Sequence, residues 1–182
     1  MAWSVFKSIM LPAMQSYSFG NSSENFAKQL TSAYDISIKT GRTTITNIPL
    51  ATGNTAGMES MLVSLLATTK FSNSVTLLQV IGPAVMTYWA GAQLALIPPL
   101  IPCPGSIVNV VATSAPVLSP GAWSPIVVPP NNNPQTFLNA FCIAATVHLT
   151  TVAGLHSCIS NYPGVPVIPG PGVLPWTGYM AG

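Results

Sequence analysis

All eight charged residues of this chain lie at or before Lys70, and residues 71–182 carry no charge. Charged residues make up only 4% of the sequence, against about 25% in a typical soluble domain. A soluble monomer needs charge spread over its surface to resist association. In the C-terminal part, Ser, Thr, Asn and Gln supply the polarity, which suits a surface that is mostly buried against partners but keeps its hydrogen bonds satisfied. The pattern therefore speaks against a free-standing soluble enzyme.

Length and hydrophobic content indicate one folded domain. A chain of 182 residues is long enough to bury a core without needing a second domain. Hydrophobic residues reach 49% and the mean hydropathy is +0.52, whereas disordered chains combine low hydrophobicity with high charge. The five Lys and Arg residues are scattered and form no basic stripe, so nucleic acid is not an expected partner.

The expected fold class is mainly α, with three to four helices, long Pro-rich extended arms and at most short strands. The first helix is expected over residues 22–40, with Ser22 or Ser23 as N-cap and Gly41 as the stop. The next helices are expected over 58–69 and from Val75 to about Ile97, the second kinked or broken at Pro83. The last is expected to start at Asn133-Pro134, where Asn caps and Pro takes the first helical position.

These patterns divide a single domain, 1–182, into five parts. We expect an amphipathic N-terminal arm suited to docking on a neighbour, a helical body, a Pro-rich arm, a helix and a C-terminal Pro/Gly-rich arm. Their respective bounds are residues 1–20, 21–97, 98–133, 134–162 and 163–182.

All but three of the eighteen prolines follow Ile97, in two blocks on either side of the last helix. Such spacing excludes regular helix and allows only short edge strands, for example Ile107–Ala112. Apolar side chains on stretched arms are best explained as straps laid across neighbouring subunits. The residues expected to bind partners in this way are Trp123, Val165, Val167, Ile168, Leu174, Trp176 and Tyr179.

Motifs for catalysis are missing from the sequence. Asp35 is the only aspartate and no Gly-x-Ser-x-Gly elbow occurs, so a hydrolytic triad is not expected. His148 and His156 are eight residues apart on the expected helix, too far along its axis to share one metal ion. We predict no catalytic residue, no cofactor and no metal site.

The three cysteines are odd in number and lack any Cys-x-x-Cys spacing. Cys103, Cys142 and Cys158 are best interpreted as buried free thiols. A disulfide bridge between one pair of them stays open.

Taken as a whole, the chain resembles the small structural proteins of virus particles, of the minor capsid, cement or tail kind. The segments that carry the resemblance are residues 33–41 (AYDISIKTG), 81–89 (IGPAVMTYW) and 147–152 (VHLTTV). Together with the composition, the resemblance implies a structural subunit located in the virion. Its partners would be other structural proteins of the same assembly and further copies of itself, bound through apolar helices and extended arms.

The alternative is an integral membrane protein with two spans, about residues 75–97 and 137–158. Both segments are uncharged and long enough for a bilayer core, which takes about 20 helical residues. Against this alternative, both contain several polar residues and neither has flanking Lys or Arg. A need for detergent in extraction would distinguish the membrane protein from the subunit of an assembly.

Overall fold

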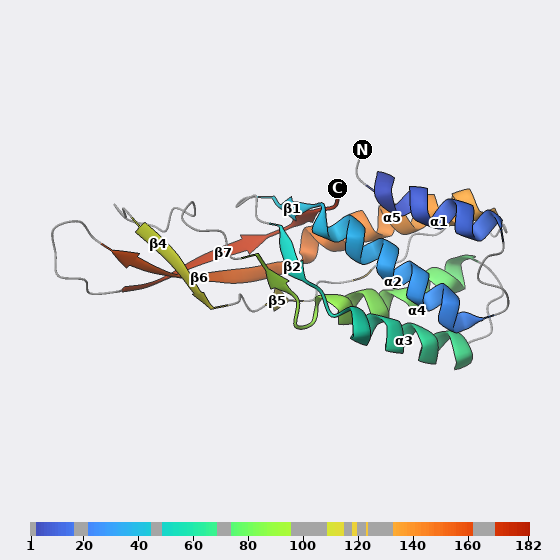
Figure 1. Cartoon of the computed structure of the whole chain (residues 1–182), viewed down its shortest axis with the longest axis horizontal. Coiled ribbons are helices and arrows are strands. Elements are labelled where there is room, and N and C mark those ends of the chain that lie inside the picture. Colours follow the sequence, from blue (N-terminus) through green and yellow to red (C-terminus); the bar gives the residue numbers. More distant parts are fainter. Residues whose placement is uncertain are drawn as a thin grey trace.

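The structure is a computed structural model, and it describes residues 3–16, 22–44, 49–68, 74–95, 109–114, 118–119, 123, 133–161 and 170–182. Within these ranges the chain forms five helices and eight strands, most of them short. The expectation of a mainly α fold is confirmed. The helices gather at one end of the molecule, and a β-ribbon extends away from them (Figure 1).

The expected N-terminal arm is a helix, α1 (Ser4–Gln15). It packs on α2 (Ser23–Lys39) and α5 (Pro134–Thr151) of the same chain, with Phe6 and Met10 buried. The expectation that this segment docks on a neighbour is therefore corrected. Phe6 and Met10 are four residues apart, so they lie on one helical face, and the core of the chain itself covers that face.

Helix α2 forms as the sequence predicts. The Ser22 side chain accepts a hydrogen bond from the Asn25 backbone N–H at 3.3 Å, and the acidic Glu24 lies in the first turn. The helix ends at Lys39, directly before Thr40 and Gly41. Its inner face buries Leu30, Ala33, Tyr34 and Ile38.

The next two helices are α3 (Thr55–Thr68) and α4 (Ser74–Trp89), which pack against each other. Pro83 lies inside α4. The helix ends at Trp89 and not near Ile97 as expected, because Gly91 has a positive φ of 82° and stops it. The chain then forms β3 (Gln93–Leu94), which pairs with β2 (Leu50–Thr52).

Helix α5 begins as predicted but ends earlier. The Asn133 side chain accepts from the Gln135 N–H at 2.9 Å, and Pro134 opens the helix. The expected helix over 134–162 stops at Thr151, and residues 153–161 form strand β6 instead. The correction has a cause outside the helix itself: β6 pairs along its length with β7 (Gly170–Thr177), the next strand in the chain.

Strands β6 and β7 form the ribbon seen in Figure 1. Their antiparallel register is regular from Ala153 opposite Thr177 to Ser160 opposite Gly170. On the other edge of β6 lie β4 (Asn109–Ser114) and β5 (Leu118–Ser119). Strand β4 overlaps the edge strand expected over residues 107–112.

The end of the expected C-terminal arm returns to the helical body at Gly178. This residue has a φ of 82°, which a glycine adopts without the steric cost of a side chain. Its N–H donates to the Val152 carbonyl at 2.8 Å and its carbonyl accepts from the Thr44 N–H at 3.1 Å. Strand β8 (Tyr179–Met180) then pairs with β1 (Arg42–Thr43). Both ends of the ribbon are thus attached to the helices.

The last residue joins the N-terminal helix. Gly182 donates from its N–H to the Ser37 carbonyl at 3.2 Å, and its carbonyl accepts from the Trp3 N–H at 2.8 Å. Trp3 itself has a left-handed backbone, with a φ of 68°, which is rare for a bulky residue. Its ring stacks on Tyr34, with centroids 5.7 Å apart, and so α1, α2 and the C-terminal residues share one aromatic core.

Candidate interaction surface

Two exposed apolar side chains of the helical body lie together on the outer face of α5. Gln135, Asn139, Ile143, Val147 and Thr150 follow one another at helical spacing and all are exposed. Ile143 is 54% exposed and Val147 is 47% exposed. The stripe carries no charged residue, because the whole of α5 lies in the uncharged part of the chain. An uncharged helix face with apolar residues at its centre is typical of a surface that another protein covers.

A shallow depression of about 500 Å³ lies beside this face, between α1 and α5. Its walls combine the start of α1 with the middle of α5. The lining residues are Trp3, Lys7, Asn139, Cys142, Ile143, Thr146 and Val147. Lys7 is the one charged residue among them, so the depression would suit a mostly apolar, uncharged side chain of a partner.

Hydrogen bonds hold the wall of the depression in place. The Trp3 indole Nε1 donates to Thr146 Oγ1 at 2.9 Å, and that hydroxyl donates to the Cys142 carbonyl at 2.7 Å. Cys142 is a buried free thiol, as expected. Burial raises the pKa of Cys142 to about 12, although the charge of Lys7 acts in the opposite direction. The thiol is therefore protonated at neutral pH, which makes it a poor nucleophile.

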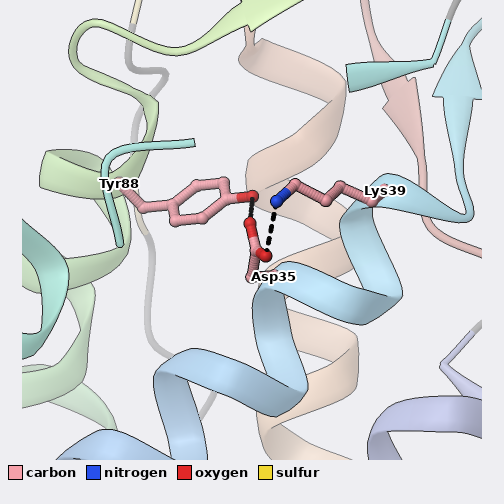
Figure 2. A network of polar contacts seen from close by, with 3 residues as sticks. All are labelled: Asp35, Lys39 and Tyr88. Carbon is pink, nitrogen blue, oxygen red and sulfur yellow. Dashed lines mark hydrogen bonds and ion pairs between the residues drawn. The ribbon is translucent and has the colours of Figure 1, made fainter. Parts of the chain in front are cut away.

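An ion pair and a hydrogen bond meet at Asp35, between α2 and α4. Asp35 accepts from the Tyr88 hydroxyl at 2.7 Å and from Lys39 Nζ at 2.8 Å, one donor for each carboxylate oxygen (Figure 2). Burial, and then the hydrogen bond to Asp35, raise the pKa of Tyr88 well above its usual value. Both oxygens of this carboxylate are engaged, and the network joins α2 to α4.

Tyr179, predicted as a partner contact, lies in the core instead. It is 3% exposed, its hydroxyl donates to the Ile38 carbonyl at 2.9 Å, and the same hydroxyl accepts from the Leu50 N–H at 2.9 Å. Burial raises the pKa of Tyr179 to about 12. The prediction is wrong for Tyr179 because β8 pairs with β1, which carries the ring inward beside Trp89.

The other predicted partner residues lie in different parts of the structure. Trp123 is half-buried and contacts its own chain, with its ring centroid 5.9 Å from Phe141 and 5.8 Å from that of the buried His148. The backbones of Leu174 and Trp176 lie in β7, opposite His156 and Gly154 of β6. Val165, Val167 and Ile168 lie outside the described residues.

Ile143 and Val147 were not predicted as partner residues, although the sequence contained a signal for them. The apolar stripe of α5 that faces the core includes Phe137, Phe141 and Leu149. In the sequence, Ile143 and Val147 lie between members of that stripe. On the helix, they lie on the opposite side. An uncharged helix with apolar residues on both sides predicts a second covered face.

Other places for chemistry are sparse in the described part of the chain. A second depression, of about 530 Å³, has lining residues on α3, and among the described ones Glu59 is titratable. Within the described ranges, no three His, Cys, Asp or Glu side chains lie close enough to hold a metal ion. None of the helices described is both long and apolar enough to cross a membrane.

Comparison with known proteins adds no relative. No protein-family model matches the sequence, and neither a curated protein nor a solved structure matches the chain.

Proposed function

We propose that this chain is a structural subunit of a large protein assembly, of the minor capsid, cement or tail kind found in virus particles. It binds neighbouring subunits through the outer face of α5 and through the β6–β7 ribbon. Its partners are other structural proteins of the same assembly and further copies of itself. Its contribution is adhesion by burial of uncharged surface, with no chemical step.

The observation that carries this proposal is the outer face of α5. Ile143 and Val147 are about half exposed and lie one turn apart, with uncharged neighbours on the same face. Covering the exposed part of each would contribute about 1 kcal/mol of transfer free energy. Several such contacts in an interface of about 1,600 Å² make stable attachment feasible.

The β6–β7 ribbon is a second feature that supports the same proposal. It extends from the helical body and belongs entirely to the uncharged part of the chain (Figure 1). Because both of its ends are attached, at Val152 and at Gly178, it reaches a neighbour as a two-stranded arm and not as a loose tail. A fixed arm loses less conformational entropy on binding than a free one.

The first experiment is density-gradient fractionation of the native source, with and without mild detergent, following the chain by mass spectrometry. Comigration with intact particles under both conditions is the expected result. Release into detergent micelles would contradict the proposal and favour the membrane alternative.

Substitutions on the outer face of α5 test whether this face binds a neighbouring subunit. Ile143→Ser together with Val147→Ser should lower incorporation into particles by about tenfold, the equivalent of about 1.4 kcal/mol, because the apolar contact is lost. The matched control is Ile36→Ser, since Ile36 is 43% exposed on α2, a helix that carries charges. Equal incorporation of the double variant and the control would overturn the role of α5.

A further inference from the structure

The indole ring of Trp123 contacts two helices at once. On α5, its centroid lies 5.9 Å from that of Phe141 and 5.8 Å from that of His148. On α4, the ring lies against the backbone of Gly82, since a Cβ at that position would come within 2.7 Å of Trp123 Cγ. Gly82, Phe141 and His148 are all buried. These three residues therefore form a socket, made by α4 and α5 together, that the indole fills.

Gly82 lies where a side chain would collide with the indole. Glycine in the interior of a helix is less favourable than alanine, because its backbone loses more freedom on folding. The ring also packs on α5, so it has little room to move away from an added methyl group. Pro83 gives a second reason for glycine, because proline crowds the Cβ of the residue before it in a helix. A test of the socket must separate these two causes.

Trp123 also follows closely on a strand that needs support. Strand β5 consists of Leu118 and Ser119 and ends four residues before Trp123. It pairs with β6 at Gly154 and Ala153, where the ribbon leaves the helices. So short a strand has little stability of its own. Its pairing with β6 should therefore depend on the contact that fixes the chain at Trp123.

We propose that Gly82, Phe141 and His148 form a binding site for an indole ring, and that Trp123 acts in this site as a latch that holds β5 on β6. The site recognises the shape and the apolar faces of the ring, since Trp123 Nε1 is buried and donates to none of the described residues. The latch belongs to the folded chain itself. It therefore goes beyond the proposed function and does not depend on it.

A double-mutant cycle separates the indole contact from the effect of Pro83. Urea unfolding is measured for the full chain, Gly82→Ala, Trp123→Ala and the double variant. Gly82→Ala should raise the unfolding equilibrium constant at least about tenfold more when Trp123 is present, because the added methyl group meets the ring only there. Strain from Pro83 is the same in both backgrounds and cancels. Equal effects of Gly82→Ala in the two backgrounds would overturn the socket, whereas folding of the double variant alone would support it.

Free indole tests whether the socket binds a ligand. At about 5 mM, indole should lower the unfolding constant of Trp123→Ala at least about twofold, because a ligand of the folded state stabilises it by mass action. The double variant with Gly82→Ala is the matched control and should not respond, since the Cβ occupies the space of the ring. The full chain should not respond either, because Trp123 fills the site. No response of Trp123→Ala, or an equal response of all three proteins, would overturn the binding site.

Hydrogen exchange followed by mass spectrometry tests the latch separately. In Trp123→Ala, the amides of Leu118 and Ser119 should exchange at least about tenfold faster than in the full chain, while those of α2 keep their rates. Such local acceleration would support the latch. Unchanged exchange in β5, or equal acceleration in β5 and α2, would overturn it and leave the indole site to be judged by the other two experiments.

Discussion

Asp35 accepts two hydrogen bonds that should contribute unequally to the stability of the fold. Tyr88 reaches it from the buried end of α4, whereas Lys39 reaches it from the next turn of α2 with a side chain that is 41% exposed. Solvent screens the second contact and not the first. The network should therefore hold α4 against α2 through the tyrosine.

Replacing these donors separately should give different losses of stability. Tyr88→Phe should lower the free energy of unfolding by about 1.5 to 3 kcal/mol, because it removes a hydrogen bond to a charged group that is largely buried. Lys39→Ala should cost no more than about 0.5 kcal/mol. Urea unfolding of both variants measures the difference, and similar losses for the two would refute the assignment. Adding salt should change the effect of Lys39→Ala alone.

Because of Tyr179, the stability of the fold should fall at alkaline pH. Burial raises its pKa from the usual value of 10.0 to about 12, so the neutral phenol is favoured in the folded state. The contribution of Tyr179 to the free energy of unfolding is about 2 to 3 kcal/mol in all. It is fully present below pH 10 and is lost as pH rises through 12. Urea unfolding between pH 8 and pH 11.5 should show the decline. Tyr179→Phe should make it shallower, although the raised pKa values of Tyr34 and Tyr88 leave part of it in place.

At the scale of elements, the main question is which part of the C-terminal arm is structural. Residues 178–182 contact the core through Tyr179 and Ala181 and bind Trp3 and Ser37 through Gly182, whereas the ribbon extends away from the helices. Removing the whole arm would thus remove part of the core, and the two pieces require separate deletions.

Shortening the ribbon should be tolerated and truncating the end should not. Replacing residues 157–173 with Asn-Gly joins His156 to Leu174, which are already opposite each other, through a two-residue hairpin turn. This variant should retain the helical circular dichroism signal and its thermal transition but fail to enter particles. Deleting residues 178–182 should destabilise the fold by about 3 kcal/mol or more, as expected when a buried aromatic is lost. Normal incorporation of the shortened chain would refute a role for the ribbon.

The sequence predicted those elements whose signals are local. The caps at Ser22 and Asn133 placed the starts of α2 and α5 correctly, because capping depends on residues within one turn. The end of α5 could not be predicted, since Thr150, Thr151 and Val152 suit either a helix or a strand and pairing with β7 decides between them. For the same reason Tyr179 was misplaced, because its burial depends on β1, far away in the sequence.

At the scale of the whole molecule, charge is confined to one part of the sequence. The charged residues lie at or before Lys70, while α4, α5 and the ribbon contain none. Attachment through the neutral part should therefore depend little on ionic strength, because no charged pairs are there to be screened.

Release from particles provides the measurement. Washing with 1 M NaCl should leave the chain attached, whereas moderate urea should release it, since urea solvates apolar and peptide groups. Release by salt with retention in urea would indicate that the charged N-terminal part makes the main contacts.

Pro171 and Pro175 have a consequence for the geometry of assembly. A sheet that can grow from both edges adds subunits without limit and yields filaments, while a sheet that can grow from one edge closes after a single addition. Pro171 and Pro175 lie in β7, opposite Ile159 and Leu155 of β6, and have no backbone N–H to offer to a further strand. Growth of the sheet through the β7 edge is therefore disfavoured, which suits a component that must appear in fixed numbers and must not polymerise by itself.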